Sequence, residues 1–201
     1  MKSFLALLFL GNGSSITAVR DGKSVDTSLG YGTMCGVPMG TRAGDFDPAI
    51  ILYMIEKLGL DAKDINGTIY KASGLLGLSG ISSDYRDVES AAREGHGRAQ
   101  IAIDVLTHSI GKYILALSAN LDKIDAVVFT AGIGENSASL RKLVCNKLKV
   151  LGVKLDETEN LKRGVTTVIS SVDSGVSIMT VPTNEELMIA LETKRLTKKS
   201  V

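Results

Sequence analysis

The segment Phe129–Ser137, with the sequence FTAGIGENS, combines residue types that can bind phosphate. An apolar run from Asp125 to Phe129 predicts a strand, glycines follow at 132 and 134, and a helical pattern begins behind Asn136. Glycines at a strand-to-helix junction let the backbone approach a ligand closely, and the helix N-terminus adds unpaired N–H groups and a positive dipole end. The pattern also fits an ordinary tight turn, so alone it leaves both interpretations open.

Other polar residues are also candidates for phosphate binding, because the sequence places them in loops or at helix starts. A second glycine-bearing loop, Leu10 to Ser15, also follows an apolar run. The remaining candidates are Arg42, Asp84, Tyr85, Arg86, Arg141 and Glu185. Phosphoryl transfer needs such a set: backbone donors cradle phosphates, guanidinium groups neutralise charge and a carboxylate holds Mg²⁺. The chain has neither the Walker A lysine pattern nor the HRD set of protein kinases.

Each candidate also has a structural interpretation. Arg42 is able to tie its loop by hydrogen bonds to carbonyls, and Asp84 and Arg86 are able to form a local ion pair that caps the following helix. Glu185 fits the first turn of a helix, where it favours the dipole. The sequence alone leaves these alternatives open.

Composition sets the limits of the function. The chain has 201 residues and a net charge of +1, with 4% aromatic residues and no Trp. These values speak against nucleic-acid binding and against attachment to an anionic membrane. Cys35 and Cys145 make no disulfide framework, and with His96 and His108 they have no metal-ligand spacing, so we expect a cytoplasmic protein without zinc. No stretch is expected to span a membrane.

The elements that must position the site begin with the apolar run from Phe4 to Leu10. Its start imitates a secretory signal, but no small-x-small cleavage site follows, so we predict a buried strand that delivers the first glycine loop. Asp21-Gly22 then predicts a hairpin between two short strands. The residues from Gly30 to Gly44 predict a long loop that carries Arg42.

The rest of the pattern is mixed α/β. Helices are predicted from Pro48 to Leu58, over 60–72, from Asp87 to Glu94, over 97–121, 137–151 and 184–196, with strands over 165–170 and 176–181 and a loop over 73–83. The predicted face of the 97–121 helix consists of Ile101, Val105, a half-buried His108, Ile110 and Leu117. We expect one domain over 1–201 with a basic tail at 197–201.

Eight segments of this chain resemble the acetate and propionate kinase family, in the order in which that family has them. They are LGNGSS at 10–15, DTSLG at 26–30, MGTR at 39–42, DPAI at 47–50, SGLLGLSG at 73–80, SSDYRD at 82–87, FTAGIGENS at 129–137 and PTNEEL at 182–187. The resemblance implies an actin- and hexokinase-type fold of two ribonuclease-H-like halves. It further implies that this chain is the C-terminal, nucleotide-binding half only.

The resemblance also assigns roles within the transfer of the ATP γ-phosphoryl group to acetate, which gives acetyl phosphate and ADP. Arg42 is implied to stabilise the phosphoryl group in flight, and Glu185 is implied to hold Mg²⁺. The implied nucleotide-binding residues are Leu10, Gly11, Asn12, Gly13, Asp84, Tyr85, Arg86, Gly132, Ile133, Gly134, Glu135, Asn136 and Arg141. The implied partners are ATP or ADP, acetate or another short-chain carboxylate, a second copy of this half and, as one alternative, a separate chain that supplies the N-terminal half.

Three departures from the family pattern weigh against activity. Phe9 stands where the family's first loop begins with histidine, and Cys35 stands where it usually carries an acidic residue. The family's N-terminal half, which supplies the catalytic aspartate, a second Mg²⁺ ligand and the groups that hold acetate, has no counterpart here. The chain is therefore an acetate kinase polypeptide, a remnant that binds ATP or a partner without catalysis, or an interaction domain without nucleotide. We predict negligible acetate kinase activity for it alone.

Overall fold

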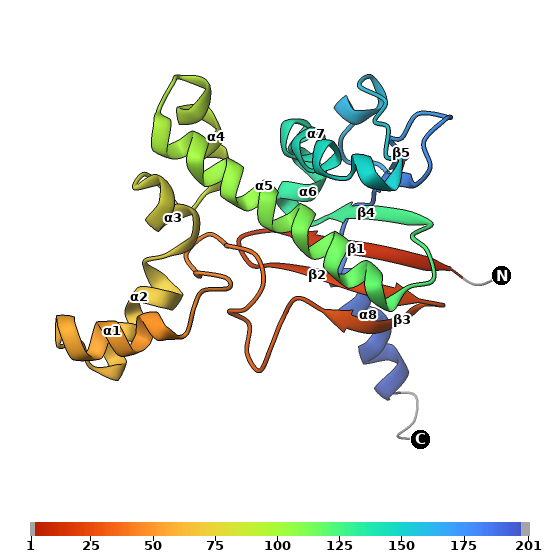
Figure 1. The fold of residues 1–201 in the computed structure, drawn as a ribbon. Helices are drawn as coiled ribbons and strands as arrows, with labels where there is room; N and C mark the ends of the chain where they lie inside the picture. The colour runs from red at the N-terminus through yellow and green to blue at the C-terminus, as the bar shows by residue number, and fades with distance from the viewer. Residues whose placement is uncertain (1–2, 198–201) are drawn as a thin grey trace.

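The computed structural model describes residues 3–197, and its centre is one six-stranded mixed sheet with the strand order β3-β2-β1-β4-β6-β5 (Figure 1). β1 pairs antiparallel with β2 and parallel with β4, which in turn pairs parallel with β6. The strands are β1 Phe4–Leu10, β2 Ser14–Arg20, β3 Lys23–Thr27, β4 Ala126–Thr130, β5 Thr167–Val168 and β6 Ser177–Thr180. The mixed α/β prediction is confirmed. Of the predicted basic tail, 198–201 lies outside the described residues.

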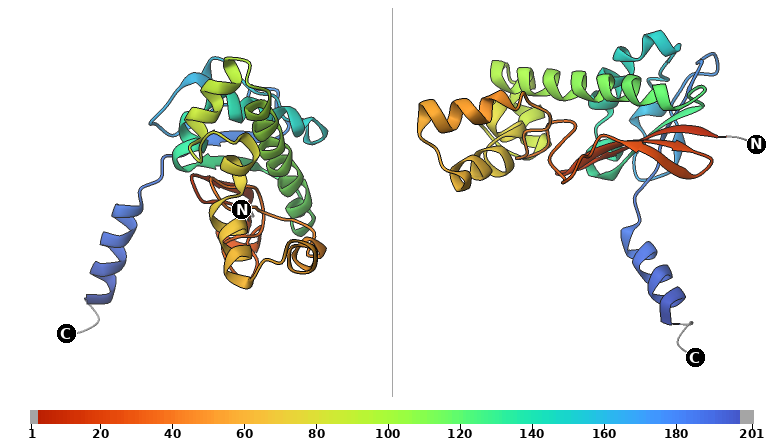
Figure 2. Two further views of the ribbon diagram at one scale, coloured as in Figure 1. Left: turned by 90° about the vertical axis from the view of Figure 1, so that its left-hand side faces the viewer. Right: turned by 60° about the horizontal axis from the view of Figure 1, so that its bottom comes forward.

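Helices cover one face of this sheet and extend beyond it. α5 crosses the sheet with α7 beside it, and α1 to α3 lie beyond one end of the strands (Figure 1). α8 leaves the body on the side of the sheet that faces away from α5 (Figure 2). The α-helices are α1 Ala49–Leu58, α2 Ala62–Lys71, α3 Gly74–Ser79, α4 Tyr85–Arg93, α5 Gly97–Leu117, α6 Ala131–Asn136, α7 Ala138–Lys147 and α8 Glu185–Thr197. Short 3₁₀ turns are η1 Ser118–Asn120, η2 Lys149–Leu151 and η3 Glu159–Leu161.

The N-terminal strands follow the sequence pattern closely. β1 occupies the middle of the sheet, and its alternate residues are buried, so the prediction of a buried strand is confirmed. Asp21 and Gly22 both have positive φ, at 52° and 75°, which is the geometry that joins two twisted antiparallel strands by a two-residue turn. The residues from Gly30 to Gly44 form the predicted long irregular segment.

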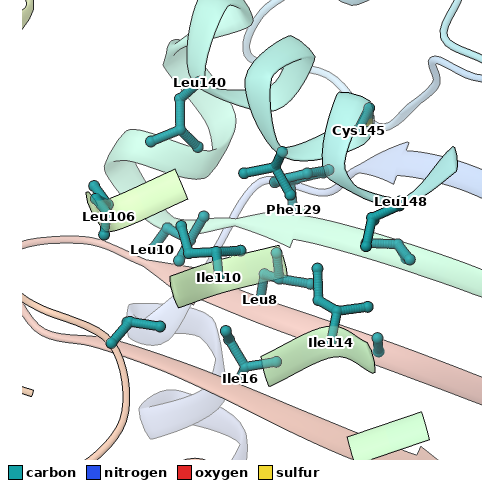
Figure 3. Packing of buried hydrophobic residues seen from close by; sticks show 14 of the residues in the cluster. Leu8, Leu10, Ile16, Leu106, Ile110, Ile114, Phe129, Leu140, Cys145 and Leu148 are labelled. Atoms are coloured by element: carbon teal, nitrogen blue, oxygen red, sulfur yellow. The ribbon is translucent and has the colours of Figure 1, made fainter. Parts of the chain in front are cut away.

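The core lies between α5 and the sheet (Figure 3). Ile110 and Ile114 of α5 are fully buried, and they share the core cluster with Leu8 of β1 and Phe129 of β4. The predicted inner face of this helix was therefore confirmed at Ile110 and Leu117 and wrong at Ile101 and His108. Ile101 is 55% exposed and His108 is also exposed, because the sheet takes the face that carries Ile103, Leu106 and Ile110.

The expectation that no stretch is long enough to span a membrane was also wrong. The segment Gly97–Asn120 has 24 residues with a mean hydropathy of 1.3, and by length and composition alone it meets the criterion for a spanning helix. Burial of part of this segment is the reason for its apolar composition, because its inner face packs on the sheet.

Several predicted boundaries shift. α3 lies inside the segment predicted as a loop over 73–83, and α4 begins at Tyr85, two residues before the predicted start. Asp84 is the N-cap of α4, since its carboxylate accepts the Arg86 N–H. The last strands shorten to Thr167–Val168 and Ser177–Thr180.

Candidate functional site

The two glycine segments meet at one edge of the sheet. β1 and β4 are parallel neighbours, with Phe9 opposite Thr130, so the loop after β1 and the helix after β4 leave the sheet side by side. In open α/β sheets, ligands bind in the crevice outside the carboxyl ends of such strands. Two cavities open there, of about 770 Å³ and about 670 Å³, and Gly11, Asn12 and Gly132 line both of them.

The glycine segment that follows β4 is a short helix, α6, and not the predicted loop. α6 begins directly after β4 because Ala131 adopts a left-handed conformation, with φ 61°. Thr183 stabilises this turn, since its Oγ1 accepts the Ala131 N–H at 2.9 Å and lies 2.7 Å from the Thr130 hydroxyl. Gly132 faces open space, whereas a side chain at Gly134 would meet Phe129.

The first glycine loop is closed by its own backbone. The Gly11 N–H donates to the Gly13 carbonyl at 3.1 Å, and the Asn12 carbonyl accepts the Gly40 N–H at 3.0 Å. A Cβ atom at Gly13 would lie in ordinary van der Waals contact with the Arg42 guanidinium, 3.4 Å from Nη1, so the Arg42 side chain lies directly against this loop. The residues 11–13 and Arg42 thus line the larger cavity together.

The structural interpretation of Arg42, as a residue that ties its own loop, is confirmed. Its Nη1 donates to the Thr33 carbonyl at 3.1 Å, which ties the long segment to itself. The side chain also lines the larger cavity, as do Glu135, Glu185 and Glu186. Guanidinium and carboxylate groups that face one cavity provide separate positions for a phosphate and for a cation.

The carboxylates of the larger cavity offer few metal ligands. Glu135 Oε1 already accepts the Thr183 N–H at 2.8 Å, and Glu185 is exposed at the start of α8. Among residues 3–197, no group of three or more His, Cys, Asp or Glu side chains is placed to hold a metal ion. This arrangement suits Mg²⁺, which keeps several waters and is usually held by one or two carboxylates together with substrate phosphates.

Asp84, Tyr85 and Arg86 line the smaller cavity together with Ile133 and Asn136. Arg86 forms an ion pair with Asp84 at 2.6 Å, and hydrogen bonds from Arg86 lower the pKa of that carboxyl to about 2. The structural interpretation of this pair, as a local ion pair that caps α4, is confirmed. It coexists with a position on the cavity wall.

Tyr85 has a buried hydroxyl without a hydrogen bond among the residues that the structure describes. Burial raises its pKa to about 12, although Ser137 and Ser139 lie near the phenol. Both serine hydroxyls instead donate to Glu89, and Ser137 also caps α7 by accepting the Leu140 N–H at 3.1 Å.

Arg141 lies behind the site and lines neither cavity. The side chain is fully buried, and its guanidinium donates to the carbonyls of Gly134, Glu135 and Asn160 and to Asn160 Oδ1. Burial lowers its pKa to about 10. Arg141 therefore holds the C-terminal end of α6, and any effect on a bound nucleotide passes through that helix.

Two charged residues of the smaller cavity were missed by the sequence analysis. Glu89 of α4 and Arg163 in the loop after η3 both line it. Glu89 lies one helical turn after Tyr85, a spacing that places both on one face of α4 and was available in the sequence. No sequence signal marked Arg163, because only the tertiary fold brings its loop to this edge. The other predicted residues lie around the cavities, except that Leu10 and Gly134 are buried beneath them.

Comparison with known proteins decides the family. A model of the acetokinase family matches residues 3–191. The chain belongs to the acetokinase family. The acetate kinase of Alkaliphilus metalliredigens is 52% identical over 187 residues, which cover 93% of this chain and 47% of that protein. This acetokinase chain therefore spans about half the length of the curated relatives it matches.

Solved structures agree with this assignment of the acetokinase chain. The acetate kinase of Porphyromonas gingivalis superposes with a TM-score of 0.92 at 40% identity, over 97% of this chain and 49% of that one. A propionate kinase from Francisella tularensis superposes with a TM-score of 0.89 at 43% identity, over 94% and 48% of the two chains. The predicted fold is thus confirmed as that of one half of these kinases.

Proposed function

We propose that this acetokinase chain binds Mg²⁺-ATP across its two cavities and is the C-terminal, nucleotide-binding half of an acetate kinase. The observation that carries the proposal is the meeting of the two glycine segments beside Arg42, where Gly11, Asn12 and Gly132 line both cavities. The nucleoside fits the smaller cavity, against Tyr85. The phosphates fit against the backbone of Gly11, Asn12 and Gly132, which lies between the two cavities.

In the proposed reaction, a carboxylate oxygen of acetate attacks the γ-phosphorus of ATP. The bond from that phosphorus to the β–γ bridging oxygen breaks, so the products are acetyl phosphate and ADP. Arg42 neutralises charge on the transferring group, and Mg²⁺, when bound, would supply further neutralisation of that charge. Glu185 is the residue that would hold the ion, and Glu186 beside it also lines the larger cavity.

We further propose that this half alone binds ATP without measurable turnover. Positioning and electrostatics carry phosphoryl transfer, and the groups that hold acetate belong to the half that this sequence does not contain. Phe9 supports this second proposal, because its apolar ring lines the larger cavity where the family pattern has histidine. A chain that binds nucleotide or a partner without catalysis is therefore the alternative function.

A thermal unfolding series tests the nucleotide site. Millimolar Mg²⁺-ATP should raise the melting temperature of the chain, since a ligand specific for the native state must stabilise it. Arg195→Ala removes an exposed arginine with a local ion pair to Glu192 away from both cavities, and it is the control for Arg86→Ala in the cavity wall. The nucleotide proposal is wrong if ATP leaves the melting temperature unchanged. The turnover proposal is wrong if the chain alone forms acetyl phosphate at the rate of a full-length enzyme.

The homodimer that the resemblance implies is also a proposal. α1 exposes apolar side chains at Ile50, Leu52, Tyr53 and Ile55, which gives this half a surface for a second copy. Light scattering of the purified chain measures its oligomeric state directly.

A further inference from the structure

Arg163 is a charged residue of the smaller cavity that has no role in the proposed reaction. It follows η3, is exposed, and lines the smaller cavity but not the larger one. None of the ion pairs within residues 3–197 involves its guanidinium. Arg163 therefore presents an unmatched positive charge at the wall of this cavity.

The other charged groups on this wall already have partners. Arg86 pairs with Asp84 at 2.6 Å. Glu89 pairs with Arg93 at 3.1 Å and also accepts two serine hydroxyls. Among the described residues that line the smaller cavity, Arg163 is thus the charged group that no opposite charge of the protein neutralises.

A buried clamp holds the loop that carries Arg163 against the end of α6. Asn160 of η3 accepts the Arg141 Nε–H through Oδ1 at 2.8 Å. Arg141 also donates to the carbonyls of Gly134 and Glu135, near the C-terminal end of α6. Burial lowers the pKa of Arg141, and the neighbouring charge of Arg163 lowers it further. Arg163 therefore lies beside the C-terminal end of α6.

That end of α6 is the one away from the proposed phosphate position. Gly132 lines both cavities, whereas Asn136 lines only the smaller one. Four residues separate them, which is about 6 Å along the helix axis. In a nucleotide the ribose lies between the phosphates and the base. A nucleotide with its phosphates at Gly132 therefore brings its base, and not its phosphates, to Arg163.

We infer that Arg163 contacts the base of the bound nucleotide and gives the smaller cavity a preference for purines over pyrimidines. A planar guanidinium stacks on the face of an aromatic ring system and is attracted to its π electrons. Because a purine has two fused rings and a pyrimidine has one, the purine offers the larger surface for this contact. The inference rests on the proposed function, since it specifies the ligand of the same cavity.

Isothermal titration with Mg²⁺-ATP and Mg²⁺-CTP tests the inference on the wild-type chain, Arg163→Ala and Lys162→Ala. Lys162 is the matched control, because it carries the same charge on the neighbouring residue, pairs locally with Glu159 at 2.6 Å and lines neither cavity. Both substituted residues are exposed, so both variants should melt within about 2 °C of the wild-type chain.

We expect Arg163→Ala to weaken Mg²⁺-ATP binding by about fivefold or more and Mg²⁺-CTP binding by less than about twofold. The ratio of the two affinities should therefore fall in this variant. Lys162→Ala should leave both affinities within about twofold of the wild-type values.

Two results would overturn the inference and leave the nucleotide site in place. One is an unchanged ATP affinity in Arg163→Ala. The other is an equal loss for ATP and CTP, which would place the arginine at the ribose or the phosphates. A wild-type chain that binds neither nucleotide would instead refute the proposed function, and the inference with it.

Discussion

At the scale of single residues, the close approach of Asn12 and Gly40 decides how the first glycine loop meets the segment that carries Arg42. A Cβ atom at Gly40 would overlap Asn12 Oδ1 and lie 3.0 Å from the Ser83 carbonyl oxygen. Only glycine leaves room here for both the amide and the backbone behind it.

Gly40→Ala should therefore displace the Asn12 amide and weaken Mg²⁺-ATP binding by about tenfold or more. Gly67→Ala is the control, because a Cβ atom at this position inside α2 meets nothing within 4 Å. The control should be more stable than wild type by about 0.5–1 kcal/mol, since alanine restricts the unfolded chain. Isothermal titration and urea unfolding measure the two effects, and unaltered ATP affinity in Gly40→Ala would contradict the argument.

The unpartnered hydroxyl of Tyr85 gives a pH-dependent prediction. Its pKa is raised from 10.0 to about 12 in the folded chain, so between pH 10 and 12 only the unfolded state readily loses the proton. The contribution of the Tyr85 proton to the free energy of unfolding is present below pH 10 and is lost as the pH rises towards 12.

Tyr85→Phe should leave stability at pH 7 unchanged or increase it by up to about 1 kcal/mol, because no hydrogen bond is lost. Above pH 10 the variant should lose stability less steeply than wild type. Urea unfolding at pH 7, 10 and 11 compares the two proteins, and a variant that is much less stable at pH 7 would show that the hydroxyl has a partner.

At the scale of elements, the sequence predicted the features that depend on neighbouring residues and missed those that depend on tertiary contacts. Asp21-Gly22 specified its turn because the required conformation depends on these two residues alone. α6 was missed, since a six-residue helix with two glycines depends on Ala131 and on the distant Thr183. Arg141 seemed to face the nucleotide, but its position depends on Asn160, whose place in the fold no local pattern indicates.

The inner face of α5 was predicted only in part, at Ile110 and Leu117, because apolar residues such as Ile101 also occur on its exposed side. Ile110→Ala should cost about 2–5 kcal/mol of unfolding free energy, because Ile110 is fully buried in the core cluster. Ile101→Ala, on the exposed side of the same helix, should cost less than about 1 kcal/mol. Chemical denaturation measures both, and similar losses would place the core on another face of α5.

At the scale of the whole molecule, the chain spans about half the length of its curated relatives. Its own residues bring the two glycine segments together at one edge of the sheet and place Arg42 on the wall of the larger cavity. The sequence predicted the family and the edge through segments in family order. It did not predict that the described residues of α8, from Glu185 to Thr197, would all lie outside the core of this chain.

Arg42→Ala should separate binding from catalysis once the halves are assembled. The variant should retain Mg²⁺-ATP binding within about tenfold and lose about 10³-fold in turnover, because an arginine that stabilises the transferring phosphoryl group acts mainly in the transition state. Arg98→Ala is a control that removes an arginine bonded to the carbonyls of Gly77 and Leu78, away from both cavities. An acetyl-phosphate assay on the assembled pair checks this, and equal losses in both variants would remove the special role of Arg42.

The parallel pairing of β1 with β4 also determines when this protein can acquire its site. The Phe4 N–H donates to the Asp125 carboxylate across a separation of 121 residues. β1 therefore cannot pair with β4 until the residues of β4 have been synthesised. During synthesis, the N-terminal hairpin emerges with its apolar β1 edge unpaired, and such edges are prone to wrong pairing. A chaperone that shields nascent strands should therefore matter more for the yield of this chain than for its final stability.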